Sequence, residues 1–193
     1  MKKQDIISFF DECAPRWDND LIRNDKVINK ILDNGGIEKG VRVLDVACGT
    51  GVLFPDYIKR GAVVTAVDIS HEMVKIAKKK FPDINIICGD VEEIDFAEKF
   101  DSVMIYNAFP HFPNPQRLIE RLSALLREGG RLSVAHGMSR EALQKHHSGK
   151  AKEVSLELPE AQKLAKIFAP YFKVDVIISD NEMYQVSGIK NNL

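Results

Sequence analysis

The stretch Val43-Leu-Asp-Val-Ala-Cys-Gly-Thr-Gly51 joins a run of apolar and β-branched residues to a glycine-rich turn. The residues that follow, 51–60, have a helical pattern, so the segment predicts a strand, a turn and a helix in succession. Glycines in such a turn let the backbone approach a ligand closely, and the first amide groups of a helix are unpaired donors. We therefore expect a nucleotide-like ligand at the carboxyl end of the strand.

Apolar and amphipathic runs alternate along the rest of the chain. Helices are expected at 51–60, 71–80 and 115–127, and the strands around them at 41–46, 63–67, 84–88, 100–106 and 130–135. This alternation indicates right-handed crossovers and a parallel sheet covered on both faces. Two further runs, 172–178 and 183–189, surround a turn and predict an antiparallel pair. The expected class is α/β, a Rossmann-like, seven-stranded, mostly parallel doubly wound sheet with an antiparallel C-terminal strand pair.

The segments outside this alternation predict how the chain is organised. We expect one domain over residues 1–193. A helical cap at 1–36, with helices at 4–13 and 21–34, precedes a cofactor-binding core at 41–135. A lid insertion at 137–160 follows, and residues 161–193 supply a C-terminal helix and the strand pair.

Composition excludes several classes of protein. The 193 residues are 45% hydrophobic and 28% charged, with 27 basic and 28 acidic side chains and a net charge of −1. A protein that binds nucleic acid usually has a basic excess, so we expect no nucleic-acid partner. No apolar run approaches the roughly 20 residues of a membrane span, and no export signal is recognisable at the N-terminus. Cys13, Cys48 and Cys88 are widely spaced, which is typical of reduced thiols in a cytoplasmic protein.

The turn itself narrows the choice of ligand. Gly49 and Gly51 match a dinucleotide-binding pattern, but Phe54 stands where that pattern has its third glycine. No lysine follows the glycines as it does in a P-loop. Asp45 within the segment and Asp68 at the end of the next strand would repel a pyrophosphate. A carboxylate suits a ribose diol and a cationic ligand, so these residues favour S-adenosylmethionine over NAD.

Four ordered motifs resemble those of class I S-adenosylmethionine-dependent methyltransferases. They are residues 43–51, residues 66–70 with Met73, residues 89–91, and residues 100–107. The N-terminal segment Phe10–Asp18 resembles the ubiquinone/menaquinone-biosynthesis group of small-molecule enzymes, except that Trp17 stands where that group usually has tyrosine. The resemblance covers roughly residues 9–135, whereas the C-terminal third resembles no family.

The resemblance implies a set of cofactor-binding residues. Asp45 would order the ammonium group, Asp68 would accept the ribose hydroxyls, and Asp90 would accept the adenine amine. The other positions implied are Trp17, Ala47, Cys48, Gly49, Gly51, Ile69, Met73, Gly89, Val91 and Asn107. Trp17 either closes the pocket over the sulfonium or anchors the N-terminal helix in the core. Cys48 is interpreted as a small apolar residue of the turn rather than a nucleophile.

The histidines are the candidates for proton transfer. His111 follows the fourth expected strand and His136 ends the fifth, so both should lie on the rim that holds the donor. Either is a general base, a metal ligand, or a polar residue lining the pocket. His146 and His147 lie in the lid and point about 100° apart on a helix, and no HxxxH spacing occurs. We therefore predict no metal site.

The expected activity is methyl transfer from S-adenosylmethionine to a small-molecule acceptor by in-line displacement, which leaves S-adenosylhomocysteine. Carbon, nitrogen, oxygen and sulfur acceptors all occur on this fold, so the fold leaves the acceptor atom and the oligomeric state open. The alternatives are a non-catalytic protein that binds adenosylmethionine, a nucleic-acid or protein methyltransferase, and an NAD-dependent oxidoreductase.

Overall fold

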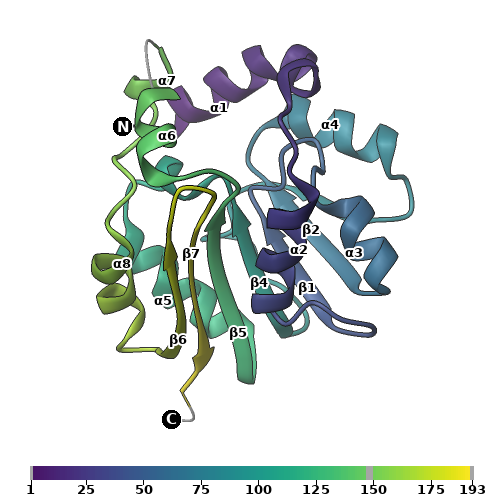
Figure 1. Cartoon of the computed structure of the whole chain (residues 1–193). Helices are drawn as coiled ribbons and strands as arrows, with labels where there is room; N and C mark the ends of the chain where they lie inside the picture. The colour runs from purple at the N-terminus through teal and green to yellow at the C-terminus, as the bar shows by residue number, and fades with distance from the viewer. Residues whose placement is uncertain (1, 147–149, 192–193) are drawn as a thin grey trace.

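A seven-stranded mixed sheet runs through the molecule, with its strands in the order β3-β2-β1-β4-β5-β7-β6 (Figure 1). The computed structural model describes residues 2–146 and 150–191. The first five strands in the chain pair in parallel, whereas β7 pairs antiparallel with both β5 and β6. The strands are β1 (Arg42–Val46), β2 (Val63–Asp68), β3 (Asn85–Cys88), β4 (Phe100–Tyr106), β5 (Leu126–His136), β6 (Phe172–Ser179) and β7 (Tyr184–Lys190). The predicted fold class is confirmed.

Helices cover both faces of this sheet. They are α1 (Lys3–Cys13), α2 (Asp25–Asn34), α3 (Phe54–Arg60), α4 (His71–Lys80), α5 (Pro115–Leu125), α6 (Arg140–His146), α7 (Lys150–Glu153) and α8 (Ala161–Phe168), with short 3-10 segments η1 (Ala14–Asp20) and η2 (Phe109–His111). α1 crosses the end of the sheet at which the parallel strands finish, and α6 and α7 lie beside it (Figure 1). No helix in the described part of the chain is long and apolar enough to cross a bilayer.

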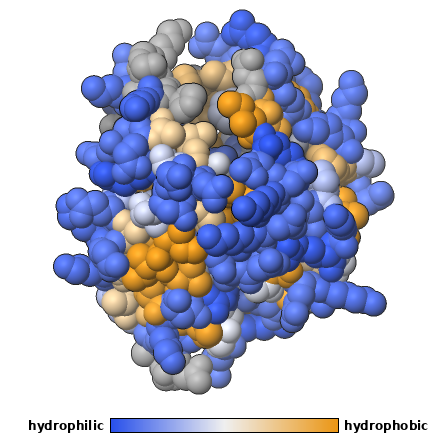
Figure 2. Space-filling view, in the orientation of Figure 1, coloured by the Kyte–Doolittle hydropathy of each residue, from blue (hydrophilic) through white to orange (hydrophobic). Residues whose placement is uncertain are grey.

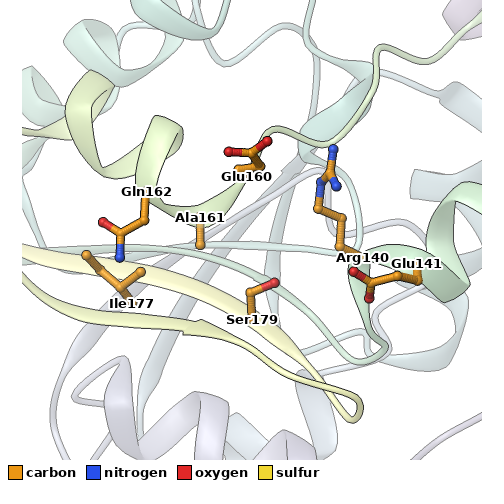
Figure 3. Close-up of a pocket in the computed structure, with 7 residues that line it drawn as sticks. All are labelled: Arg140, Glu141, Glu160, Ala161, Gln162, Ile177 and Ser179. Carbon is orange, nitrogen blue, oxygen red and sulfur yellow. The ribbon is translucent and has the colours of Figure 1, made fainter.

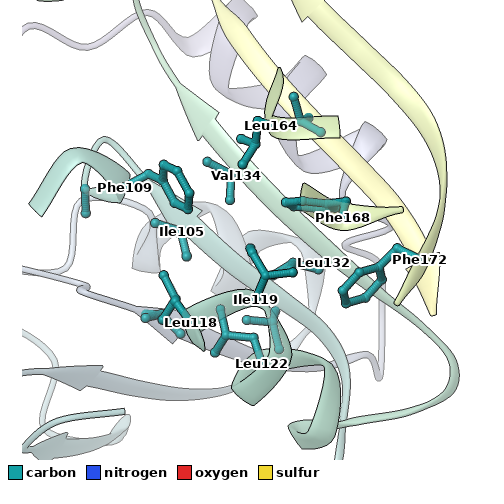
Figure 4. Packing of buried hydrophobic residues seen from close by; sticks show 14 of the residues in the cluster. Ile105, Phe109, Leu118, Ile119, Leu122, Leu132, Val134, Leu164, Phe168 and Phe172 are labelled. Carbon is teal, nitrogen blue, oxygen red and sulfur yellow. The ribbon is translucent and has the colours of Figure 1, made fainter. Parts of the chain in front are cut away.

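Two apolar cores fix the sheet between its helices. On one face, side chains of α5 and α8, including Leu118, Leu122 and Phe168, pack against β4 and β5 (Figure 4). On the other face, α2, α3 and α4 pack against β1 and β2. Each helix presents apolar residues three and four positions apart, which is the spacing that puts them on one side. The result is a rigid support for the loops that leave the carboxyl ends of the strands.

Several element boundaries differ from the sequence-based expectations. The helix expected from residue 21 begins at Asp25, because the Asn24 side chain accepts a hydrogen bond from the backbone N–H of Val27 at 3.2 Å. The helix expected from residue 51 begins at Phe54. The fifth strand starts at Leu126 instead of 130, with a shift of register opposite Phe100 and Ser102. Residues 137–160, where a lid is expected, contain two short helices, α6 and α7.

Hydrophobic side chains gather on the surface near the C-terminal pair of strands. Figure 2 shows a hydrophobic patch over these strands. Ile177 of β6 is 41% exposed. β6 is the last strand of the sheet, and its outward-facing residues alternate with half-buried ones. This region lies away from the glycine-rich turn, which follows β1 in the middle of the sheet.

Candidate active site

The order of the sheet reverses between β1 and β4, and this point organises the site. Strands β2 and β3 lie on one side of β1, and β4 and β5 lie on the other. Val46 pairs with Val67, and Asp68 pairs with Cys88, so β1, β2 and β3 finish at neighbouring positions. In open α/β sheets, ligands bind in the crevice at such a reversal. We call the ends of β1, β2 and β3 the donor half of the site, and the ends of β4 and β5 the acceptor half.

The turn after β1 has an unusual backbone. Ala47, Gly49 and Gly51 have φ angles of 57°, 55° and 88°, so alternate residues adopt the left-handed conformation. Ala47 carries the strain that this conformation imposes on a residue with a side chain. A Cβ atom added to Gly51 would lie 2.5 Å from the ring of Phe54, which is fully buried. The aromatic ring of Phe54 therefore explains the glycine at 51.

Asp68 ties the end of β2 to this turn. Its carboxylate accepts hydrogen bonds from the backbone N–H groups of Gly49 at 2.7 Å and Ser70 at 2.9 Å. Its carbonyl oxygen accepts from the N–H of Gly89 at 2.9 Å, which joins the end of β3 to the same group. Burial raises the pKa of Asp68, and the two hydrogen bonds to its carboxylate oppose that shift. Each carboxylate oxygen has a second lone pair that a ligand hydroxyl can use.

Asp45 lies beneath the turn and is 2% exposed. Burial, and then the negative charge of Asp68, raise the pKa of Asp45 well above its ordinary range. Tyr57 of α3 is fully buried, and burial together with the nearby Asp45 raises the pKa of its phenol. When two carboxylates are buried close together, ionisation of one makes ionisation of the other less favourable. A positive charge near both carboxylates is therefore favoured.

Cys48 and Trp17 both lie at the glycine-rich turn, one buried and the other exposed. The Cys48 thiol is buried, and its Sγ lies 3.7 Å from the carbonyl oxygen of Gly49. Burial, and then the charges of Asp45 and Asp68, raise the pKa of this thiol, so it stays protonated. Trp17 is 40% exposed and lies over the turn, with its Nε1 3.9 Å from where a Cβ on Gly49 would be. Exposure of this extent does not fit a core anchor.

Asp90 follows β3 at the far side of the donor half. One of its oxygens accepts from the N–H of Glu92 at 2.8 Å, and the other forms an ion pair with Lys3 at 2.5 Å. Gly89 before it has a φ of 156°, and Val91 after it is buried. Two other expected cofactor-binding residues lie after β2: Met73 is buried in α4, and Ile69 is half-buried.

Three residues of the N-terminal segment make contacts with the donor half and its neighbours that were not predicted from sequence. Besides Lys3 on Asp90, Asp11 accepts from the Ser70 hydroxyl at 2.6 Å and from the Glu72 N–H. Asp18 accepts from the Thr50 hydroxyl at 2.6 Å and pairs with Lys80. The residues that meet are far apart in the chain, and no sequence pattern indicates that they pair.

The acceptor half contains Asn107 and the two histidines. Asn107 has a φ of 56°, and its side-chain oxygen accepts from the N–H of Gly137 at 2.9 Å, which joins the ends of β4 and β5. His111 is half-buried at the end of η2, and its Nδ1 lies 2.9 Å from the carbonyl oxygen of Val154. His136 is fully buried, with its ring 6.0 Å from that of Tyr184. Their roles stay predictions.

The remaining candidate sites are a metal centre and a surface pocket. Among residues 2–146 and 150–191, no group of three or more His, Cys, Asp or Glu side chains could hold a metal ion. His146 ends α6, and His147 lies outside the described residues. A surface pocket of about 380 Å³ is lined by residues of α6, α8 and β6, among them Arg140, Gln162 and Ser179 (Figure 3). It shares no residue with the donor or acceptor half.

Comparison with known proteins agrees with this geometry. A family model described as a methyltransferase domain matches residues 44–134. The chain is 33% identical over 140 residues to a demethylmenaquinone methyltransferase of Renibacterium salmoninarum, across 69% of this chain and 59% of that protein. It is 39% identical over 99 residues to a ubiquinone biosynthesis O-methyltransferase of Coxiella burnetii, across 49% of this chain and 42% of that protein. The chain therefore contains a methyltransferase domain, and the relatives that it resembles are methyltransferases.

Solved structures show the same fold as this methyltransferase chain. The magnesium protoporphyrin IX methyltransferase of Synechocystis PCC 6803 with bound S-adenosylhomocysteine gives a TM-score of 0.73 at 19% identity, across 98% of this chain and 100% of that one. The N-methyltransferase NodS of Bradyrhizobium japonicum gives 0.73 at 11% identity, across 97% and 100%. The predictions of a methyltransferase and of S-adenosylmethionine as its cofactor agree with these matches. The chain spans about half the length of the curated relatives it matches.

Proposed function

We propose that this protein transfers a methyl group from S-adenosylmethionine to a small-molecule acceptor by in-line displacement and leaves S-adenosylhomocysteine. The observation that carries the proposal is the hydrogen bond from the Gly49 N–H to Asp68. This hydrogen bond joins the glycine-rich turn, in which alternate residues have left-handed backbone conformations, to a carboxylate at the point where the strand order reverses. Such a site offers backbone donors and a diol acceptor at once.

The residues of the donor half suit an adenosyl ligand with a positive charge. We assign the ribose hydroxyls to Asp68, the adenine amine to Asp90 with the Val91 N–H beside it, and the ammonium group to Asp45. The buried carboxylates at 45 and 68 support this assignment, because a cation relieves their mutual repulsion. S-adenosylmethionine supplies a methyl group on a positively charged sulfur, which is already an activated leaving group.

The protein then has to align the reactants and exclude water. We propose that residues 2–24 and 137–160 cover the two halves of the site and select the acceptor, with Trp17 closing over the turn. The contacts of Lys3, Asp11 and Asp18 with the donor half support this proposal. Positioning of this kind supplies effective molarities of about 10⁵–10⁸ M, which accounts for much of the acceleration of a displacement reaction.

The proposed class of acceptor is inferred from the curated relatives and from the net charge of the chain. The two curated relatives are a demethylmenaquinone methyltransferase and a ubiquinone biosynthesis O-methyltransferase, so a small organic acceptor is proposed. The net charge of −1 gives no basic surface for nucleic acid. Cys13, Cys48 and Cys88 all lie within the described residues and form no disulfide, which supports action in the reducing cytoplasm.

Calorimetric titration of the full chain with S-adenosylhomocysteine and with NADH tests the proposal. We expect one S-adenosylhomocysteine to bind per chain and no heat from NADH. A mass-spectrometric assay for S-adenosylhomocysteine across a panel of phenols, thiols, amines and carbon acids should then detect turnover. Binding of NADH alone would overturn the proposal. Binding without turnover on any member of the panel would favour a non-catalytic adenosylmethionine-binding protein.

A further inference from the structure

The contacts of His111 define which of its ring nitrogens carries a proton. Its Nδ1 lies 2.9 Å from the carbonyl oxygen of Val154 and 3.2 Å from the hydroxyl oxygen of Ser155. The ring stands edge-to-face against Phe10 of α1, with centroids 4.8 Å apart. The N–H of Leu156 donates to the carbonyl oxygen of Pro110 at 2.7 Å, so residues 154–156 run beside η2 and hold the ring from one side.

A carbonyl oxygen can only accept a hydrogen bond, whereas a serine hydroxyl can donate or accept. The contact with Val154 is therefore satisfied only when Nδ1 carries the hydrogen. Donation from Ser155 to Nδ1 would leave a nitrogen lone pair facing the lone pairs of the Val154 oxygen at hydrogen-bond distance. The carbonyl thus sets the tautomer, and Ser155 acts as a second acceptor or donates elsewhere. In the neutral ring the lone pair then belongs to Nε2.

We propose that the Val154 carbonyl fixes His111 as the Nδ1–H tautomer, which makes Nε2 of His111 the general base of the reaction and residues 154–156 its positioning element. This inference rests on the proposed methyl transfer and deepens it, because it requires an acceptor that carries a proton, such as a hydroxyl or a carbon acid. It also links the lid segment 137–160 to the chemistry, since the segment supplies the group that orients the base.

The step balances without any further reactant. Nε2 accepts the proton of the acceptor, and the electron pair released at the acceptor atom forms the bond to the methyl carbon. The pair of the carbon–sulfur bond stays on sulfur, which yields neutral S-adenosylhomocysteine. The positive charge of the sulfonium is thereby replaced by that of the imidazolium, which afterwards gives its proton to water.

His136 is the weaker candidate for this role. It is fully buried at the end of β5, opposite Tyr184 of β7 in the strand register, and the rings of the two residues pack edge-to-face. A base at this position would need an opening to reach an acceptor, whereas half-buried His111 lies in the loop that follows β4. The structure therefore separates two histidines that the sequence treats alike.

Nitrogen-15 NMR of the full chain with bound S-adenosylhomocysteine tests the tautomer directly. Long-range proton–nitrogen correlations distinguish a protonated from an unprotonated ring nitrogen, and the His111→Asn variant identifies the His111 signals. At a pH where the ring is neutral, we expect Nδ1 of His111 to be protonated and Nε2 to be unprotonated. The exposed His71 serves as an internal reference. The reverse pattern for His111 would overturn the inference, while binding of S-adenosylhomocysteine would still support the proposed function.

Three variants separate positioning from chemistry. Asparagine places its amide N–H near Nδ1, and glutamine places it near Nε2. His111→Asn should therefore keep Tm within about 1 °C, whereas His111→Gln should lower it by about 2–4 °C. Both should bind S-adenosylhomocysteine normally and lose at least about 100-fold in turnover on the acceptor found in the panel. Full turnover by His111→Asn would show that His111 is no base.

Ser155→Ala tests which of the two neighbours sets the tautomer. We expect the Nδ1–H signature of His111 to persist in this variant, because the Val154 carbonyl is unchanged. A switch to the Nε2–H form would assign control to the serine hydroxyl and contradict the inference.

Discussion

The donor half and the acceptor half of the sheet edge hold their polar groups by different contacts. In the donor half, backbone N–H groups of Gly49 and Ser70 fix the Asp68 carboxylate, and all three residues lie within one strand–turn–helix unit and its neighbour. In the acceptor half, His111 is held by Val154, 43 positions along the chain, and His136 packs on Tyr184 of the C-terminal strand pair. The first arrangement is local and the second depends on segments outside the core.

This difference has a consequence for function. A site made from neighbouring backbone groups keeps its geometry wherever the strands are formed, which suits a ligand common to a whole family. A site assembled from residues 137–160 and the C-terminal strands changes whenever those segments change, which suits an acceptor that differs between enzymes. Substitutions in the two halves should therefore affect binding of the donor to very different extents.

The largest effect is expected for Asp68→Ala. The variant removes the carboxylate that holds the Gly49 N–H, the Ser70 N–H and, as proposed, the ribose. Loss of charged hydrogen bonds of this kind should raise the Kd for S-adenosylhomocysteine at least about 100-fold in calorimetric titration. The matched control is Asp175→Ala, which removes a carboxylate of β6 that pairs with Arg131 of β5. An unchanged Kd for the Asp68 variant would mean that the donor binds elsewhere.

The next largest effect is expected for Gly51→Ala. The new Cβ would lie 2.5 Å from the Phe54 ring, at a φ of 88° that disfavours any side chain. Overpacking and backbone strain together should cost about 2–3 kcal/mol and lower Tm by about 5–10 °C. Gly40→Ala provides the control, since Gly40 has a φ of 82° and nothing within 4 Å of its added Cβ. Equal losses of Tm in both variants would show that the Phe54 contact contributes nothing.

The same contrast explains what the sequence predicts well. Strands β1 to β4 coincide with their expected positions within two residues, because β-branched runs between glycine turns admit few other structures. The order of Asp45, Asp68 and Asp90 along these strands indicates the donor half without any tertiary information. Such features depend on local pattern and on the rule that parallel strands end at one edge.

The features that the sequence does not predict are those that depend on distant contacts. Nothing near Lys3 or Asp18 indicates that they reach Asp90 and Thr50, because their partners are chosen by how α1 and η1 lie across the sheet. The extra residues at the start of β5 arise from a shift of register against β4. The positive φ of Asn107 follows from joining β4 to η2 while its side chain accepts from Gly137.

A smaller effect, with the opposite sign, is expected for Asp45→Asn. Burial and the charge of Asp68 raise the pKa of Asp45 in the folded protein above its unfolded value of about 4. Folding thus favours the protonated form, so Asp45 costs stability increasingly as the pH rises from its unfolded pKa to its folded pKa. The amide removes this cost, so Tm at pH 7 should rise by a few degrees.

The gain from Asp45→Asn should shrink as the pH falls towards about 4 and vanish below it. Thermal unfolding between pH 4 and pH 8 measures this trend, and Asp83→Asn, at an exposed position, should show none of it. A lower Tm at pH 7 would mean that Asp45 is stabilised as an anion in the folded chain. Weaker binding of S-adenosylhomocysteine by the stabilised variant would identify Asp45 as a residue kept for function.

The smallest effect is expected for Lys3→Gln, at the contact between α1 and the donor half. Lys3 pairs with Asp90 and Glu93, and these carboxylates raise its pKa, so it stays charged across the physiological range. Because its side chain is about half exposed, the pair contributes at most about 1 kcal/mol. The adenine amine would compete with this ammonium for the same Asp90 carboxylate. Removal of the charge should therefore strengthen binding of S-adenosylhomocysteine by about two- to fivefold.

Salt distinguishes competition at Asp90 from closure by α1. If Lys3 competes with the ligand, raising the ionic strength should strengthen binding by the wild type and bring its Kd towards that of Lys3→Gln, because an exposed ion pair is screened. Lys75→Gln is the matched control, since Lys75 pairs with Glu72 on its own helix and not with Asp90. Weaker binding by Lys3→Gln would instead show that Lys3 closes over the donor. The N-terminal segment would then be part of the donor half, and the two halves of the site would differ less than their contacts suggest.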